Sequence, residues 1–327
     1  MNGNEVYIKM YNNRIENKIK SRPNISFLRG YTNSISIDLS ETTIYLYLGI
    51  VINFIDYTHK DNGDFKYDDY LNYMASLKDK TSGYQISTYS ALCKLSSYLH
   101  MVEICNKDYM TKIKRPKFIE KIETKQKRDT NYLTKKELHR YIENIKNYSS
   151  ENTREINQAF NWKERDLGII MLFLTTGMRC SALFKLNVDN IDLENNSLKT
   201  VDKERRIEEH FFSKEVADVL KIWLIKRNEL LNNKNEDALF ISRNRKRLSQ
   251  KGITKVVEKY SFNINGKNIT PHKLRATYGT QIYEKTHDIY MVQQCMGHAS
   301  PTTSQLYIRG QKNKGRQQAS EIMSNLL

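Results

Sequence analysis

Two arginines and a histidine in the C-terminal half of the chain have the types and spacing of an anion-binding site. Arg179 stands two residues after Gly177, in a turn expected behind an apolar helix, and Ser181 is a plausible cap for the next helix. His272 and Arg275 lie three residues apart at the start of another predicted helix, so their side chains share one face. The positive end of that helix and the arginine would both favour a phosphate group. Taken alone, each segment is more often structural, and Arg179 could equally belong to a salt bridge.

Three further side chains could transfer a proton or act as a nucleophile. Lys203 lies at the tip of a predicted hairpin, with Lys199 as a nearby alternative. Asp288 can cap a helix over 289–296 that Gly297 ends, so His298 lies just outside that helix. Tyr307 lies about two turns into a short helix. Each signal is weak by itself, because a hairpin lysine is usually solvated and the chain has 21 tyrosines.

The charge of the chain points to a polyanionic partner. The sequence has 327 residues, enough for two domains, and carries 53 Lys+Arg against 37 Asp+Glu, a formal net charge of +16. Lysine and arginine that meet phosphates release condensed counterions, so this excess favours nucleic acid. The alternative is a solvated basic surface or a compositional bias toward lysine.

Cysteine usage and hydropathy bound the class of protein. The four cysteines lie far apart without C-x-x-C pairs, so we expect reduced thiols and neither a disulfide framework nor a metal site. We find neither the apolar core of a signal peptide nor an apolar run long enough to span a membrane. These features predict a soluble cytoplasmic protein without membrane partners.

The N-terminal part of the sequence predicts a small helical domain. Residues 1–34 are polar, asparagine-rich and without clear period, which predicts a loosely ordered lead segment. Residues 35–115 form the helical domain. Its helices are expected over residues 40–58, 67–78, 86–104 and, more briefly, near 107–113.

A basic stretch begins near the end of this helical domain. The basic stretch covers residues 107–128, and residues 116–130 read as an exposed linker. The cations of this stretch could follow a DNA backbone or simply be solvated. The candidate DNA contacts are Lys112, Lys114, Arg115 and Lys117.

The rest of the chain, residues 131–310, predicts a mixed α/β domain. Thr134 and Glu137 form a capping box, and residues 166–175 read as a buried helix. An antiparallel meander is expected over residues 188–193, 198–201 and 207–212. The fold class is therefore mostly α with a small antiparallel β-sheet. Residues 311–327 form a C-terminal tail.

The order and spacing of these segments resemble the tyrosine recombinase (lambda integrase-like) family. The resemblance covers about residues 38–310 and is strongest over 270–309, the block that holds His272-x-x-Arg275, Gly297-His298 and Tyr307. Residues 40–115 resemble the family's SAM-like core-binding domain. The resemblance implies a helical DNA-binding domain followed by a mixed α/β catalytic domain.

For the site, the resemblance implies that Arg179 and Arg275 hold the scissile phosphate, with a further hydrogen bond from His298. Guanidinium groups match phosphate oxygens and stabilise the extra charge of the transition state. The resemblance implies no metal and no cofactor.

The resemblance also implies the proton transfers. Tyr307 would attack the phosphorus and form a 3′-phosphotyrosine link, while His272 accepts its proton. Lys203 would protonate the leaving 5′-oxygen. Two departures stand out: the family usually has an acid where this chain has Ala182, and often a histidine where it has Ala276. Support for Arg179 must then come from elsewhere.

Within this family, we expect an integrase that moves a mobile element. Its partners would be double-stranded DNA with inverted-repeat core sites and three further copies of the chain, in a homotetramer that acts through a Holliday junction. It would be a monomer when free, and an accessory directionality factor could assist it. The tail would pack on a neighbouring protomer or on its own. The alternatives are a Xer-like chromosome or plasmid dimer resolvase, a type IB topoisomerase-like enzyme, and a non-catalytic DNA-binding relative.

Overall fold

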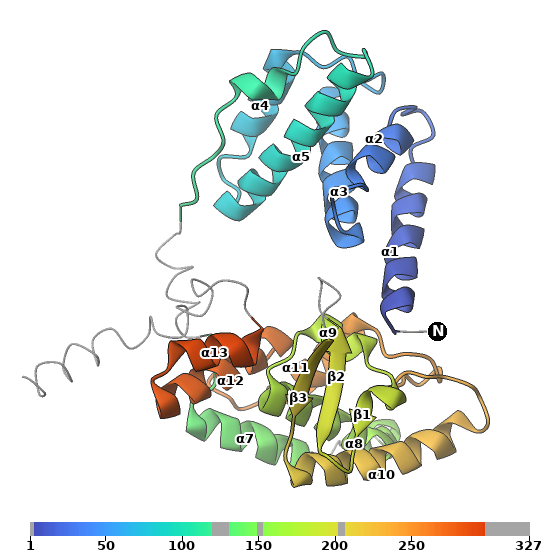
Figure 1. The fold of residues 1–327 in the computed structure, drawn as a ribbon, viewed down its shortest axis with the longest axis vertical. Helices are drawn as coiled ribbons and strands as arrows, with labels where there is room; N and C mark the ends of the chain where they lie inside the picture. The colour runs from blue at the N-terminus through green and yellow to red at the C-terminus, as the bar shows by residue number, and fades with distance from the viewer. Residues whose placement is uncertain (1–2, 120–130, 149–152, 202–206, 298–327) are drawn as a thin grey trace, which may run out of the picture. The chain divides into compact units, whose positions relative to one another are not determined.

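A computed structural model of the chain describes residues 3–119, 131–148, 153–201 and 207–297 (Figure 1). The chain divides into two compact units, one over Glu5–Ile122 and the other over Met1–Asn4 with Glu123–Leu327. Within the described ranges the chain is mostly helical with one small antiparallel sheet, which confirms the predicted fold class. No helix in those ranges is both long and apolar enough to cross a bilayer.

The first unit is a helical bundle. Its elements are α1 (Gly3–Lys20), α2 (Leu28–Ile35), α3 (Glu41–Thr58), α4 (Tyr67–Ser76), α5 (Ser82–Met101) and the 3-10 helix η1 (Tyr109–Lys112). The predicted helices are therefore present, each within a few residues of the expected bounds. Leu48, Val51 and Phe54 of α3 are fully buried, as are Leu92 and Leu95 of α5. These side chains join α3 and α5 into one core.

The prediction of a loosely ordered lead segment over residues 1–34 was wrong. That stretch forms α1 and α2, and its residues from Glu5 onward belong to the first unit. Leu28, Tyr31 and Ile35 recur at helical spacing and are buried in the core of the unit. Helix α2 is only eight residues long and has polar neighbours. Its short apolar face therefore gives little indication of a helix in the sequence pattern.

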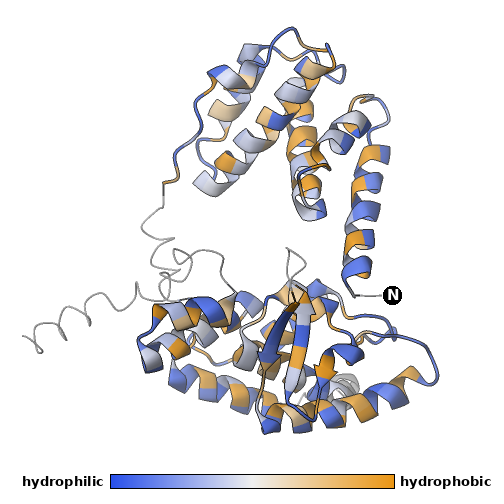
Figure 2. Ribbon diagram, viewed as in Figure 1, coloured by the Kyte–Doolittle hydropathy of each residue, from blue (hydrophilic) through white to orange (hydrophobic). Residues whose placement is uncertain are grey.

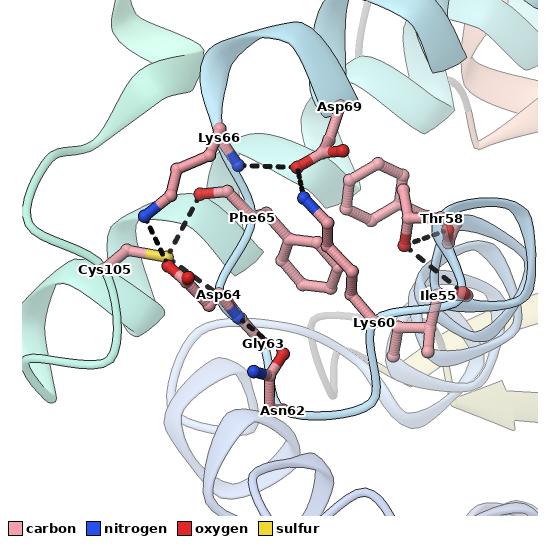
Figure 3. A network of polar contacts seen from close by, with 11 residues as sticks. Ile55, Thr58, Lys60, Asn62, Gly63, Asp64, Phe65, Lys66, Asp69 and Cys105 are labelled. Atoms are coloured by element: carbon pink, nitrogen blue, oxygen red, sulfur yellow. Dashed lines mark hydrogen bonds and ion pairs between the residues drawn. The ribbon is translucent and has the colours of Figure 1, made fainter.

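The connection between α3 and α4 is held by a polar network (Figure 3). Asp69 accepts a hydrogen bond from the backbone N–H of Lys66 at 2.7 Å and pairs with the Lys60 ammonium at 2.6 Å. The buried Cys105 thiol donates to the Gly63 carbonyl at 3.2 Å. Burial raises the pKa of Cys105, so this thiol keeps the proton that it donates. The cysteine therefore serves the fold of this unit.

The second unit surrounds a three-stranded sheet. Its helices are α7 (Lys135–Lys146), α8 (Thr153–Thr176), α9 (Cys180–Lys185), α10 (Lys214–Leu231), α11 (Gln250–Lys259), α12 (Pro271–Thr286) and α13 (Ile289–Met296). The strands β1 (Ile191–Asp192), β2 (Ser197–Val201) and β3 (Ile207–Phe211) are antiparallel in the order β1-β2-β3. The predicted first strand over 188–193 was too long, because it begins as the 3-10 turn η2 (Val188–Asn190).

Helix α8 is the centre of the second unit, and α10 and α12 pack against it. Leu172 and Phe173 of α8 are fully buried, and so are Leu220 and Trp223 of α10. Figure 2 shows hydrophobic and hydrophilic patches alternating along α7 and α10, as expected of helices with one face toward a core. The predicted buried helix over 166–175 is thus the C-terminal half of α8.

Glu137 links the start of α7 to the loop that leads into α12. It forms the predicted capping box with Thr134, accepts from Asn265 at 3.0 Å and pairs with Lys267 at 2.8 Å. Burial raises the pKa of Glu137, but the hydrogen bonds from Lys267, Thr134 and Asn265 outweigh it and lower the pKa to about 2. A carboxylate with a lowered pKa stabilises the fold above its ordinary pKa of 4.5, and this contribution is lost as the pH falls toward 2.

Glu137→Gln is therefore expected to lower the free energy of unfolding of the second unit by about 3 kcal/mol at neutral pH, because it leaves a partly buried ammonium without its counterion. The difference from wild type should shrink as the pH falls through 4.5. Urea denaturation at several pH values measures both effects. Glu143→Gln is the matched control, since Glu143 lies exposed on the same helix. Equal stability of Glu137→Gln and wild type at pH 7 would contradict the prediction.

Candidate active site

The turn after α8 depends on a glycine. Gly177 has a φ of +60°, and a Cβ at this position would lie 2.2 Å from the ring of Tyr278 on α12. The helix therefore ends at Thr176 as predicted, and the Gly177 carbonyl is directed to a side chain of α12. Arg179 follows as the N-cap residue of α9. Ser181, the cap expected from the sequence, lies inside that helix instead.

Arg275 is buried between two helix ends. Its side chain comes from the second turn of α12 and the residue is only 7% exposed. One guanidinium nitrogen donates to the Gly177 carbonyl at the end of α8, and another donates to the Met296 carbonyl at the end of α13. The C-terminal end of a helix carries partial negative charge, which favours a cation there. The guanidinium is thus held by backbone carbonyls at the ends of two other helices.

Arg179 contacts the same helix end. Its side chain is exposed, and Nη2 donates to the Gly297 carbonyl at 3.3 Å. Gly297 is the left-handed C-cap of α13, and Asp288 caps the other end by accepting from two backbone N–H groups, as predicted. The two arginines, 96 positions apart in sequence (179 and 275), therefore meet at the C-terminus of α13. A backbone carbonyl therefore supports Arg179 in this chain, which has Ala182 at the position where the family usually has an acid.

Both arginines line one small pocket of the second unit. Its other polar walls come from α9, β2 and β3, and Ala182 is part of its lining. The polar or charged residues around it are Arg179, Ser181, Lys185, Thr200, Glu208, His210 and Arg275. A pocket with three cationic side chains is suited to an anion, and its two guanidinium groups suit a phosphate in particular.

His272 occupies the first turn of α12, as predicted. Thr270 caps this helix by accepting from the Lys273 N–H, and Pro271 takes the first helical position. The surrounding protein and then the positive charge of Arg275 lower the pKa of His272. The imidazole is therefore biased toward its neutral form, which can accept a proton.

His210 lines this pocket, whereas His272 is not among its lining residues. No motif in the sequence pointed to His210. Its Nε2 lies 3.0 Å from the Thr200 hydroxyl across the hairpin. Burial lowers the pKa of His210, the nearby Glu208 raises it, and Arg275 lowers it further. The alternation of exposed and half-buried residues along β3 places Glu208 and His210 on one face. That alternation was the available signal, but only the fold shows which face meets the arginines.

Several predicted site residues fall outside the described ranges. These are Lys203, His298 and Tyr307, together with most of the linker over 116–130 and the tail over 311–327. The alternative lysine, Lys199, is exposed on β2 next to Thr200, whose side of the strand faces the pocket. Lys199 is not among the residues that line the pocket, although Val201, two positions further along the strand, is.

The predicted DNA contacts lie in the first unit. All of them are exposed, in η1 or in the segment that follows it, and they are Lys112, Lys114, Arg115 and Lys117. Within the described ranges no group of three or more histidine, cysteine or carboxylate side chains could hold a metal ion.

Comparisons with known proteins agree on one family. The sequence model described as the Phage integrase family matches residues 121–314. Among curated relatives, a tyrosine recombinase XerC of Alcanivorax borkumensis is 31% identical over 144 residues, which is 44% of this chain and 47% of the relative. A tyrosine recombinase XerD of Staphylococcus epidermidis is 29% identical over 48% of this chain and 54% of the relative. The chain thus matches about half the length of these relatives.

Solved structures share the fold. The XerH site-specific recombinase bound to a palindromic difH substrate superposes with a TM-score of 0.64 at 23% identity, over 86% of this chain and 79% of that one. A lambda integrase dimer bound to a COC′ core site superposes with a TM-score of 0.59 at 14% identity, over 88% and 79%. The arrangement of helices and sheet described above is the one that these proteins share.

Proposed function

The chain belongs to the phage integrase family, and on that premise we propose that it is a tyrosine site-specific recombinase. It cleaves and rejoins DNA through a 3′-phosphotyrosine intermediate. The observation that carries the proposal is the convergence of Arg179 and Arg275 on the C-terminal end of α13, in one pocket with Lys185. Distant segments of the chain bring two guanidinium groups together there, and guanidinium groups match the oxygens of a phosphate.

The two arginines have distinct tasks in this mechanism. Arg275 is buried and held by two carbonyls, so it is already oriented before DNA arrives. Arg179 is exposed and makes one weaker contact, so it can turn toward an incoming phosphate. Together they stabilise the charge that accumulates on the phosphate oxygens in the pentacoordinate transition state. We assign a further hydrogen bond to His298, which directly follows the carbonyl that holds Arg179.

The covalent step falls to Tyr307. The phenol attacks the phosphorus, the 3′-oxygen stays bound in the phosphotyrosine, and the 5′-oxygen leaves. A phenol with a pKa near 10 needs a proton acceptor at neutral pH, and the neutral imidazole of His272 is the candidate base. Lys203 protonates the leaving 5′-oxygen.

The substrate that we propose is double-stranded DNA with inverted-repeat core sites. The net charge of +16 and the exposed cations Lys112, Lys114, Arg115 and Lys117 support it. Four copies, monomeric when free, would assemble on two sites and exchange strands through a Holliday junction, with the tail packing on a neighbour and a directionality factor assisting. We place this activity in the cytoplasm.

We propose integration and excision of a mobile element as the biological role. Resolution of chromosome or plasmid dimers is the second candidate, and the XerC and XerD relatives favour it. Sequencing the DNA beside the gene separates the two. Inverted repeats at the ends of a mobile element support the first role, and a lone site in an otherwise unbroken chromosome supports the second.

A nicked suicide substrate tests the activity itself. In such DNA a short fragment diffuses away after cleavage, so the covalent complex accumulates and runs as a slower band on a denaturing gel. The expected result is a protein–DNA adduct that survives denaturation and disappears on protease treatment. Absence of an adduct across a library of candidate sites, with DNA binding intact, would contradict both the recombinase and the topoisomerase-like reading and leave the non-catalytic relative.

The proposed role of His272 predicts the pH dependence of cleavage. Its lowered pKa keeps the imidazole neutral, and able to accept the tyrosine proton, as the pH falls through 6.5. The single-turnover cleavage rate should therefore stay level at pH 6.5 and decline only below it. His272→Gln should cleave more slowly and lose that acid limb. A limb centred above pH 6.5 in the wild type would contradict the assignment.

A further inference from the structure

Among the described residues, a single acid lines the pocket that holds Arg179 and Arg275. It is Glu208 of β3, whose side chain is about one-third exposed. One carboxylate oxygen lies 3.9 Å from Nε2 of His210. The other lies so close to Gly297 that a Cβ there would approach it to 2.7 Å. The carboxylate thus rests against the residue whose carbonyl accepts from Arg179.

The strand register explains why this acid, and not its neighbour, faces the site. Glu208 pairs with Thr200 of β2, and Thr200 also lines the pocket. Glu209 points to the other face, where it is exposed and accepts a hydrogen bond from Ser197 at 3.2 Å. The two adjacent glutamates therefore carry the same charge on the same strand, but only Glu208 lines the pocket with the arginines.

The pocket has an electrostatic need that Glu208 meets. Arg179, Arg275 and Lys185 line it together, and their like charges repel. Backbone carbonyls supply only partial negative charge to the two guanidinium groups. Ala182 on α9 lines the same pocket and offers no charge at all. Among the described residues that line the pocket, the full negative charge is that of Glu208 on β3.

We propose that Glu208 is a positioning residue for the cleavage reaction: its carboxylate balances the two arginines and fixes the Gly297 turn against which Arg179 is held. The inference rests on the proposed function. Because the turn directly precedes His298 in sequence, a shift in Gly297 would displace two of the proposed phosphate-binding side chains, Arg179 and His298. A misplacement of about 1 Å at a reacting centre costs on the order of 100-fold in rate.

The test compares Glu208→Gln with Glu209→Gln on the suicide substrate. Glu208→Gln should cleave about 10- to 100-fold more slowly in single turnover, while its Kd for DNA stays equal or improves, because a negative charge has left the pocket. Glu209→Gln should match wild type in both. An unfolded or loosened variant would instead lose affinity as well, and the thermal midpoint monitors this directly. Wild-type cleavage by a folded Glu208→Gln would overturn the proposal.

A charge returned from the opposite wall provides a rescue. The double variant Ala182→Glu with Glu208→Gln should cleave at least tenfold faster than Glu208→Gln alone, since residue 182 lines the same pocket. Glu209→Gln combined with Ala182→Glu serves as its control and should gain nothing. Failure of the rescue, together with a cleavage rate for Glu208→Asp as low as for Glu208→Gln, would show that the charge is not what matters and would overturn the proposal.

A second readout does not depend on cleavage, so it separates this inference from the proposed function. The Nε–H signals of Arg179 and Arg275 in nitrogen-15 NMR spectra report how firmly each guanidinium is held, and Arg→Lys variants assign them. Glu208→Gln should broaden or shift the Arg179 signal, and Glu209→Gln should leave it in place. An unchanged Arg179 signal in Glu208→Gln would overturn the positioning role. A changed signal in a protein that forms no adduct would support the role and contradict the recombinase activity.

Discussion

Tyr307→Phe is expected to abolish the covalent protein–DNA adduct and to leave DNA binding intact. The substitution removes one oxygen, which is the atom that attacks phosphorus, and retains the ring. Loss of a nucleophile typically costs on the order of 10⁵-fold or more in rate. Since DNA affinity arises mostly from cations that meet phosphates, the Kd should stay within about twofold of wild type. Adduct formation on a suicide substrate and a gel-shift titration measure the two quantities.

Tyr290→Phe is the matched control for this variant. Tyr290 lies near Tyr307 in sequence and is 69% exposed on α13, so loss of its hydroxyl should change neither cleavage nor binding. An adduct formed by Tyr307→Phe at the wild-type rate would show that another group is the nucleophile. Peptide mapping of the adduct then identifies that group, and the family assignment of Tyr307 fails for this chain.

Arg275→Lys is expected to lower the cleavage rate by about 100- to 1000-fold. A lysine keeps the charge, but its single ammonium cannot bind the Gly177 and Met296 carbonyls and also present two parallel donors to a phosphate. The loss should appear in the single-turnover rate and only weakly in the Kd for DNA. Burial of the site also predicts a lower thermal midpoint, because the new ammonium leaves one of the two carbonyls unpaired.

Arg227→Lys separates the loss of stability from the loss of chemistry. Arg227 is also buried, at 4% exposure, and it also donates to two backbone carbonyls, those of Ala238 and Glu236. It does not line the pocket that holds Arg179 and Arg275. The control should lower the thermal midpoint and leave the cleavage rate of the folded protein unchanged. If Arg275→Lys cleaves at the wild-type rate, Arg275 does not stabilise the transition state.

The local features of the fold were predictable because they depend on residues close together in the chain. A capping box needs only Thr134 and Glu137, and the start of α13 needs only Asp288 and the N–H groups that follow it. Helix ends at Gly177 and Gly297 follow from the freedom of glycine to adopt a positive φ. Two local predictions were wrong. Residues 188–190 form the 3-10 helix η2 and no strand, and Arg179 takes the N-cap position of α9 that was expected of Ser181. In both places the surrounding fold, which the local pattern does not include, decides the conformation.

What the sequence by itself determined is therefore the order of elements, the basic character, and the family pattern that contains Arg179, His272 and Arg275. The tertiary structure decided which groups hold those side chains. Arg275 bonds to a carbonyl 98 residues away, and Arg179 to one 118 residues away. Any backbone carbonyl has the same chemistry, so residue type carries no record of such a partner. Only the packing of α8, α12 and α13 brings the two carbonyls and the acid on β3 to the arginines.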